Sequence, residues 1–517
     1  MRIGTYIAAG CIALAFAATG LRAAVPTLDS VYPPGGKKGG EIELTLSGKF
    51  DPWPCAIWFS GKGLTFTPDP KKKGVGKLRI APDAPSGPVF VRAHNAEGAS
   101  APVFFIVSER NEILEEESDK STVSGAPSLD RTQLPLVLNG TLSAGGELDS
   151  KRLTLEKGET LHAAVEAYAL RSRVDPALHL HDTAGNRLLL EHDGPENLDP
   201  RLTFTAPKKA DYVISLAGFS HPPATSVAYT GSKNATYRLH LALQREQLPP
   251  HLVPADPGPD SSGDLLAPGK PLVGTLKTAG EPARYKITAK KGDKLVVKVE
   301  GRALGYPIDP VLRILKPDGS VIRTQDDTAK HPDPEYLWTV PADGDYGITV
   351  SDRFSRAGET MRFRLSAAPP VADFTVALDK DRYTLERGKA LEIKATVTRL
   401  RGHKENLTFT LPGLPSGITL TAPETIPEKG GEVVLKLEAK ADAPAVSLAL
   451  RVVATEKQAE GDKKARAKNA AFSLKDDNYR GPYVLDEIEE IWLTLPPLKE
   501  EKKEEKKEAK AKEKPKK

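Results

Sequence analysis

The chain has 517 residues and a formal net charge of +4. The charge is concentrated at the end, because residues 499–517 contain ten Lys and six Glu, which leaves the rest of the chain close to neutral. A near-neutral chain with 6% aromatic residues has no electrostatic footprint for nucleic acid. We therefore expect no nucleic-acid partner, and the length predicts several domains.

The first residues are typical of a secretory signal peptide. Arg2 supplies a basic start, an Ala-rich apolar run follows from Ile7 to Ala18, and Leu21-Arg22-Ala23 is an acceptable cleavage site. The run is too short to span a membrane, although an uncleaved anchor is the alternative. We expect residues 1–23 to be removed and the protein to be secreted, periplasmic or on the cell surface. One cysteine then remains, Cys55, which predicts no internal disulfide and a small buried side chain.

Residues 24–108 are expected to form a first β-sandwich. Turn-forming residues 30–36 precede an alternating strand at 41–46, and residues 88–93 and 102–107 have the pattern of later strands. This order resembles immunoglobulin-like modules, in particular those of planctomycete-type exported proteins. Residues 109–135 are expected to be a linker, acidic between Glu112 and Asp119.

The two central segments are copies of one another. Asp175-Pro176-Ala177-Leu178-His179-Leu180 recurs as Asp309-Pro310-Val311-Leu312-Arg313-Ile314, which lies 134 positions later. The same offset relates the following motifs, and it falls to 126 only at the last strand, where Tyr237 corresponds to Phe363. Each copy is a folding unit, expected at residues 136–245 and 271–368, with a proline-rich linker at 246–270.

Each copy is predicted to be an antiparallel β-sandwich. Leu295, Val297 and Val299 alternate with more polar residues, which is the period of a half-buried strand. Lys316-Pro317-Asp318-Gly319 is a turn signal between two apolar runs. Because no window has a sustained helical stripe, the expected fold class is all-β, with tandem antiparallel sandwiches.

The order of motifs in these copies resembles the bacterial pre-peptidase C-terminal (PPC) domain. The resemblance rests on Gly-Thr-Leu, Lys-Gly-Asp/Glu, Asp-Pro-x-Leu-x-Leu, Asp-Gly, Asp-Pro and Asp-Tyr, and the second copy matches better than the first. It implies a jelly-roll-like sandwich that is appended to secreted peptidases and other exported proteins. The family supplies no catalytic residues, so the resemblance implies that the chain is not an enzyme.

Residues 369–498 are expected to form a fourth sandwich, so that four sandwiches follow in a row. Residues 391–397 and 433–439 alternate cleanly, and the segment resembles immunoglobulin-like modules beside carbohydrate-active domains in secreted bacterial enzymes. The apolar stretch from Ile488 to Leu495 is expected to add a C-terminal strand. Residues 499–517 have no apolar face and are expected to be a disordered, solvated tail; contact with an anionic cell surface is the alternative.

Two histidine-containing segments are candidates for chemistry, and neither is favoured. Gly218-Phe219-Ser220-His221-Pro222 lacks the final glycine of a nucleophile elbow and has no α/β context, so Ser220 and His221 are not expected to be catalytic. His179 and His181 lie on one face of a strand and could bind a metal as a pair. Their counterparts are Arg313 and Leu315, so we expect solvent-facing histidines instead.

Aspartates that recur in both copies are the strongest candidate site. They are Asp175, Asp193 and Asp199 in the first copy and Asp309, Asp327 and Asp333 in the second, with Glu191 and Asp326 nearby. Calcium prefers several oxygen ligands from carboxylates and loop carbonyls, so calcium is one hypothesis. Aspartates at turns also accept hydrogen bonds from backbone N–H groups, and we favour this structural role. No other cofactor is expected.

These observations favour a secreted, non-catalytic protein of several β-sandwiches, acting as an extracytoplasmic binding or scaffolding module. Its expected partner is an extracellular protein or polysaccharide. The alternative is an accessory part or relative of a secreted peptidase, which assists the export of that enzyme or its attachment to substrate.

Overall fold

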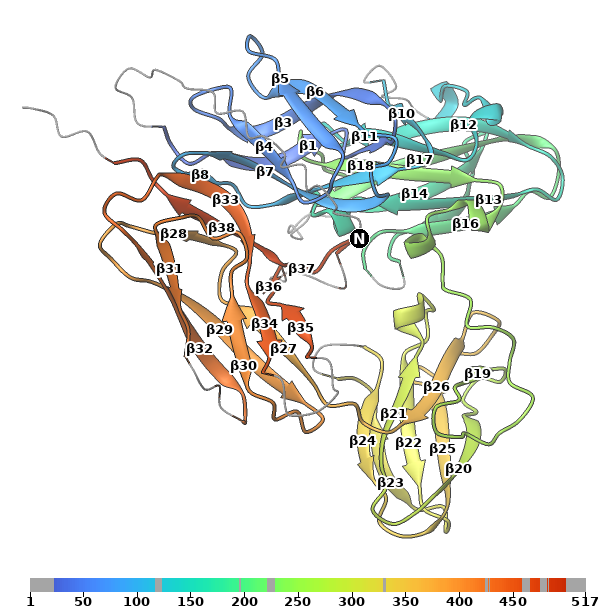
Figure 1. Cartoon of the computed structure of the whole chain (residues 1–517). Helices are drawn as coiled ribbons and strands as arrows, with labels where there is room; N and C mark the ends of the chain where they lie inside the picture. The colour runs from blue at the N-terminus through green and yellow to red at the C-terminus, as the bar shows by residue number, and fades with distance from the viewer. Residues whose placement is uncertain are drawn as a thin grey trace, which may run out of the picture.

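The fold is known from a computed structural model, and it is built almost entirely of strands (Figure 1). The structure describes residues 23–116, 123–194, 197–220, 228–328, 332–423, 426, 428–457, 465–474, 481 and 483–498. The helical segments within these ranges are 3-10 turns of three residues each: η2 (Val123–Gly125), η3 (Arg131–Gln133), η4 (Tyr168–Leu170), η5 (Arg245–Gln247), η6 (Pro250–Leu252) and η7 (Arg302–Leu304). The all-β fold class is therefore confirmed. The signal segment up to residue 22, His221 and the charged tail lie outside the described residues.

Sandwich 1 consists of the sheets β1-β3-β6-β5 and β2-β9-β7-β4, with β8 paired to β7. Its strands are β1 (Thr27–Tyr32), β2 (Gly35–Lys37), β3 (Glu41–Lys49), β4 (Ala56–Phe59), β5 (Leu64–Pro68), β6 (Val75–Ile80), β7 (Gly87–Asn95), β8 (Gly98–Ala99) and β9 (Val103–Ser108). Alternate residues point inward, so Leu44 and Leu46 of one sheet meet Val91 and Phe105 of the other in one core. Cys55 is buried in this core, as expected, and burial raises the pKa of its thiol to about 11.

Sandwich 2 packs the sheet β10-β11-β18-β13-β16 on the sheet β12-β17-β14-β15. Its strands are β10 (Asn111–Leu114), β11 (Leu136–Thr141), β12 (Asp149–Leu155), β13 (Thr160–Glu166), β14 (Val174–Asp182), β15 (Arg187–Glu191), β16 (Arg201–Thr205), β17 (Ala210–Ser220) and β18 (Thr236–Ala242). Strand β10 corrects the expected linker at 109–135, because it pairs in parallel with β11 and Ile113 packs against the core.

Sandwich 3 repeats this arrangement with the sheets β19-β26-β21-β24 and β20-β25-β22-β23. Its strands are β19 (Leu272–Thr275), β20 (Ala283–Ala289), β21 (Lys294–Glu300), β22 (Pro310–Leu315), β23 (Val321–Gln325), β24 (Glu335–Thr339), β25 (Gly344–Asp352) and β26 (Arg362–Ala368). The expected turn joins β22 to β23, with Lys316 N–H donating to Ser320 O over 2.8 Å and Gly319 at a φ of 84°. In the linker at 246–270, Leu248 and Leu252 are buried in a small cluster with residues of sandwich 2.

Sandwich 4 consists of the sheets β27-β29-β32-β31, β28-β38-β33 and β30-β34-β35, and of the pair β36-β37. Its strands are β27 (Asp373–Leu378), β28 (Arg382–Thr384), β29 (Leu391–Leu400), β30 (Leu407–Thr410), β31 (Ile418–Thr421), β32 (Gly431–Ala439), β33 (Val446–Arg451), β34 (Val453–Glu456), β35 (Ala467–Asn469), β36 (Phe472–Ser473), β37 (Glu487–Ile488) and β38 (Glu490–Leu495). Strand β38 lies between β28 and β33, so the C-terminal apolar stretch supplies a central strand.

The four sandwiches do not form a simple row, because sandwich 4 packs against sandwich 1 (Figure 1). Arg92 of β7 donates from Nη2 to Oδ2 of Asp381 over 2.7 Å, and the Arg92 side chain is fully buried. Beside this pair, the rings of Trp58 and Trp492 meet edge to face at 5.8 Å. The ends of the described chain are close here, since a β-carbon at Gly98 would lie 3.2 Å from the Val25 side chain and 3.8 Å from Thr494 Oγ1.

Sandwich 1 also contacts sandwich 2 through a buried ion cluster. Arg238 of β18 donates from Nη1 to Oε2 of Glu166 over 2.6 Å, and Nε2 atoms of His240 and His251 lie 2.7 Å and 2.6 Å from the same carboxylate. The Arg238 guanidinium lies directly under Gly35, where a β-carbon would meet Arg238 Nε at 2.6 Å. Burial opposes the charge of Glu166, but the Arg238 guanidinium and the hydrogen bonds with the two histidines hold the pKa of its carboxyl well below its usual range.

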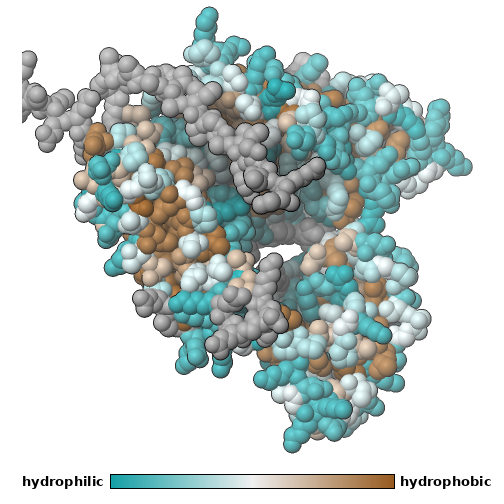
Figure 2. All heavy atoms as spheres, viewed as in Figure 1, coloured by the Kyte–Doolittle hydropathy of each residue, from teal (hydrophilic) through white to brown (hydrophobic). Residues whose placement is uncertain are grey.

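The surface differs between sandwiches. Figure 2 shows hydrophilic residues over most of sandwich 3, at the lower right, whereas hydrophobic residues gather on part of sandwich 4. Within the described part of the chain, no helix has the length and apolar character needed to cross a membrane.

Candidate metal centre

Asp199 and Asp333, one in each copy, hold a backbone turn. The Asp199 carboxylate accepts hydrogen bonds from the N–H groups of Ala167, Tyr168 and Ala169, at 3.0, 2.8 and 2.8 Å. These donors belong to the turn η4, whose N–H groups otherwise have no helical acceptor.

The second copy has the same arrangement. The Asp333 carboxylate accepts from Gly301, Arg302 and Ala303 at 3.0, 3.0 and 2.8 Å, at the start of η7. Asp333 is 3% exposed, and burial raises its pKa although the three donors oppose this. Both carboxylates therefore accept hydrogen bonds from backbone N–H groups at a turn, which is the structural role that the sequence favoured.

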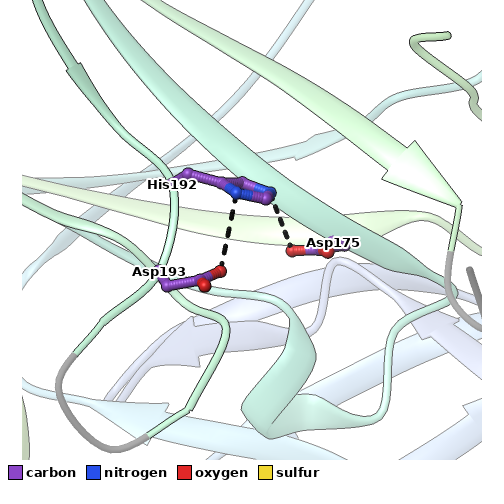
Figure 3. A group of neighbouring side chains, drawn as sticks. All are labelled: Asp175, His192 and Asp193. Carbon is purple, nitrogen blue, oxygen red and sulfur yellow. Dashed lines mark ion pairs between the residues drawn. The ribbon is translucent and has the colours of Figure 1, made fainter. Parts of the chain in front are cut away.

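Asp175 and Asp193 lie with His192 in a different group, shown in Figure 3. Asp175 is the second residue of β14, and His192 and Asp193 directly follow its antiparallel partner β15. His192 Nε2 lies 3.4 Å from Asp175 Oδ1, and His192 Nδ1 lies 3.6 Å from Asp193 Oδ1. Among the residues that the structure describes, this is the one group of three metal-binding side chains whose ligand atoms lie within 4.8 Å of one another.

The chemistry of this group differs from that of a calcium site. Calcium prefers oxygen ligands, whereas one imidazole nitrogen with two carboxylates suits a transition metal such as zinc or manganese. The contacts of His192 with both carboxylates also account for the group without an ion. Calcium at Asp175 and Asp193 stays a hypothesis, beside the structural role that the sequence favours.

In the second copy the corresponding residues are arranged differently. Asp326 stands where the first copy has His192, and it forms an ion pair with Arg353 of the turn after β25. Arg353 in turn stands where the first copy has Phe219, whose ring meets His192 edge to face at 5.1 Å. Burial raises the pKa of Asp327, and the nearby carboxylates of Asp309 and Asp326 raise it further. Unlike Asp199 and Asp333, the pairs Asp175/Asp309 and Asp193/Asp327 thus do not build the same site in both copies.

His179 and His181 are not solvent-facing, which corrects the expectation from the sequence. They are 5% and 8% exposed, and their rings stack at 5.7 Å. The Tyr229 hydroxyl lies 3.1 Å from His179 Nε2 and belongs to the connection that is eight residues longer in the first copy. Burial, assisted by His181, lowers the pKa of His179 to about 4, so this ring is neutral at neutral pH.

Of the segment that resembles a nucleophile elbow, the structure describes Ser220, whereas His221 lies outside the described residues. Ser220 is the last residue of β17, in a sheet of a β-sandwich and not at a strand-to-helix turn. His192 was missed as a member of the group in Figure 3. The sequence contains a signal for it, because His192 lies 134 positions before Asp326. Asp326 is one of the acidic residues near the recurring aspartates.

Comparisons with known proteins show distant likenesses only. No family model matches the chain, and no curated protein matches it. Among solved structures, the pre-peptidase C-terminal domain of a collagenase from Bacillus anthracis is similar over 22% of this chain and 99% of its own, with 11% identity and a TM-score of 0.17. The four N-terminal Ig domains of Dscam1 isoform 7.44 cover 91% of this chain and 98% of their own, with 11% identity and a TM-score of 0.21.

A third similar structure is SGBP-B of the Bacteroides ovatus mixed-linkage glucan utilization locus, in complex with a mixed-linkage heptasaccharide. It covers 62% of this chain and 74% of its own, with 10% identity and a TM-score of 0.15.

Proposed function

We propose that this protein is an extracytoplasmic, non-catalytic scaffold that presents binding surfaces on a rigid frame of four β-sandwiches. The observation that carries the proposal is the contact of sandwich 4 with sandwich 1. A buried arginine with a carboxylate partner from another sandwich is costly to separate, because separation leaves an uncompensated charge. A chain of independent modules joined by flexible linkers would have no need of such a contact.

Apolar packing around this contact supports a rigid frame. One cluster joins Phe104 and Ile106 of sandwich 1, Leu170 of sandwich 2, and Tyr483 and Ile488 of the last segment. Three parts of the chain that lie far apart in sequence thus share a single core. Such a core holds its elements in one arrangement because protein interiors are close-packed.

The candidate residues support a non-catalytic role. Asp199 and Asp333 are occupied by backbone N–H groups, and His179 is buried against Tyr229. A catalytic site needs a nucleophile or base within hydrogen-bond reach of a substrate in an accessible pocket. Asp199, Asp333 and His179 therefore do not offer a nucleophile or base in such a position.

The test is an assay of the full chain from its native host. We expect the protein to be recovered outside the cytoplasm with its first residue near Ala24, and to hydrolyse neither casein nor a panel of polysaccharides. Hydrolysis that disappears in Ser220→Ala or His221→Ala, but persists in the exposed control Ser86→Ala, would refute the proposal.

A further inference from the structure

Sandwich 3 has a pocket on the outer face of the sheet β20-β25-β22-β23. Its volume is about 390 Å³, which lies within the range of roughly 300–1,000 Å³ that is usual for small-molecule sites. Val311 and Arg313 of β22 and Ser351 of β25 line it, together with the connection between β19 and β20 and the turn after β25. Because Leu312 and Ile314 point into the core, Val311 and Arg313 face outward.

In the first copy a tyrosine, Tyr229, lies in the place that corresponds to this pocket. Gly146 N–H donates to Tyr229 O over 3.0 Å, and the corresponding Gly280 N–H donates to Ser355 O over 3.1 Å. Tyr229 therefore corresponds to Ser355, in keeping with the offset of 126 at this end of the domain. Tyr229 covers His179, whereas the second copy has the short Ser355 above Arg313. The duplicated fold is thus complete without the pocket.

The turn that borders the pocket is held in a strained conformation. Ser355 has a φ of 58°, which is unfavourable for a residue other than glycine. The buried Asp352 carboxylate holds this turn, because it accepts from Phe354 N–H at 2.9 Å and from Arg356 N–H and Nε at 3.0 Å each. Burial opposes the charge of Asp352, but the donors from Arg356 and the backbone lower its pKa to about 2. The turn is therefore rigid.

This rigid turn presents an aromatic ring to solvent. Phe354 is 65% exposed, and the Arg356 guanidinium lies 5.2 Å from the centre of its ring. The residue that corresponds to Phe354 in the first copy is Ala228, so the fold does not require an aromatic side chain here. Phe354 is not part of the pocket lining, but it lies between two residues that are, Arg353 and Ser355.

The charges of the pocket indicate what kind of ligand it fits. Its lining contains three cations and three anions: Arg313, Arg353, Arg356, Glu281, Asp326 and Asp352. Two of the cations are already paired, Arg353 with Asp326 and Arg356 with Asp352. A charged ligand would meet as many like charges as opposite ones. A ligand with many hydroxyl groups can donate to the carboxylates and accept from the guanidinium groups at the same time.

We propose that this pocket binds a neutral saccharide, with a sugar ring against Phe354 and its hydroxyl groups on Arg313 and on the Arg353–Asp326 pair. The inference rests on the proposed binding role and gives that role a ligand class. The apolar C–H face of a pyranose ring suits the Phe354 ring, and its equatorial hydroxyl groups suit the paired charges.

The test is calorimetric titration of the full chain with the neutral tetrasaccharides cellotetraose, maltotetraose and mannotetraose. Tetragalacturonate and gelatin peptides represent an acidic saccharide and a protein partner. We expect one of the neutral sugars to bind, and Phe354→Ala to weaken this binding about tenfold, the loss of roughly one aromatic contact. Arg313→His should also weaken it. Both variants introduce the residue of the first copy, so the unfolding temperature should not change.

The matched control is Leu337→Ala, which removes another exposed apolar side chain, from β24 on the opposite sheet, and should leave binding unchanged. The proposal is overturned if none of the three neutral sugars binds, if tetragalacturonate or gelatin binds in their place, or if Phe354→Ala binds as well as the wild type. Cleavage of a bound sugar would refute the non-catalytic role but would support this binding site, so the two failures are distinguishable.

Discussion

At the scale of single residues, the recurring aspartates show how far the sequence can be interpreted. Their offset of 134 and their positions beside prolines and turns indicated a structural role in both copies. Which N–H groups they bind could not be predicted, because the donors to Asp333 lie 30 to 32 positions earlier in the chain. The burial of His179 could not be predicted either, since it depends on Tyr229, 50 positions later.

We expect Asp333→Asn to destabilise sandwich 3 by about 1–3 kcal/mol, because the amide keeps one acceptor oxygen where the carboxylate uses two for three donors. The loss should be the same in EDTA and in millimolar calcium. Calorimetry of the full chain measures it, with Asp327→Asn, an exposed aspartate, as a control of smaller effect. A calcium-dependent rise in unfolding temperature that Asp333→Asn abolishes would instead indicate ligation.

Glu115 makes stability depend on pH. Burial, together with the nearby Asp149 carboxyl, raises the pKa of Glu115 from 4.5 to about 9. The folded chain therefore keeps a proton that the unfolded chain loses near pH 4.5, so this residue's contribution to stability falls as pH rises from about 4.5 to about 9. Denaturant unfolding at several pH values should show that Glu115→Gln lessens this fall. Glu156→Gln, which removes an exposed carboxylate, should leave it as in the wild type.

At the scale of secondary structure elements, alternation of apolar residues was the most reliable signal. It predicted residues 391–397 and 433–439, which lie within β29 and β32. It missed β10, because the acidic residues of that segment are typical of a linker. Glu112 is not a solvated charge, however, since its carboxylate accepts from Asn139 Nδ2 over 2.6 Å and pairs with the buried Arg238. Partners from other strands neutralise the charge in this strand. The sequence of such a strand therefore does not show the usual alternation of apolar and polar residues.

The glycine of the repeated Gly-Thr-Leu motif has a steric role in both copies. A β-carbon at Gly140 would lie 2.2 Å from the Tyr237 hydroxyl, and one at Gly274 would lie 2.2 Å from the Tyr285 hydroxyl. We expect Gly140→Ala and Gly274→Ala each to cost about 1–3 kcal/mol through overpacking. Chemical denaturation checks this. Gly344→Ala is the control, because its nearest contact would be an ordinary 3.5 Å and it should be tolerated.

At the scale of the whole molecule, the sequence predicted four sandwiches but not how they pack. Patterning separates inward from outward residues within one sheet, and it cannot show that an outward residue such as Arg92 is buried by another sandwich. Arg92 and Asp381 are 289 positions apart, and neither lies in a recognisable motif. Contacts of this kind arise from the folded surfaces and have no local signal.

Asp381→Asn should weaken the contact between sandwiches 1 and 4, because it leaves Arg92 buried beside a neutral amide; the cost is on the order of 3 kcal/mol. Small-angle X-ray scattering should then show a larger radius of gyration than in the wild type. Glu41→Gln removes a partner of the exposed Lys77 on the same sandwich and should not change the scattering. An unchanged radius in Asp381→Asn would contradict the role of the ion pair in holding the frame closed.

The proximity of Val25 and Thr494 at Gly98 has a mechanical consequence. A pulling force applied near these two residues acts first across the contact of sandwich 4 with sandwich 1 and with Leu170 of sandwich 2, and not along the strands of sandwiches 2 and 3. In a single-molecule stretching experiment, the first rupture should therefore be the separation of sandwich 4 from sandwich 1, and only then would tension reach the two duplicated domains. Until this contact breaks, the central half of the chain would carry little of the applied force.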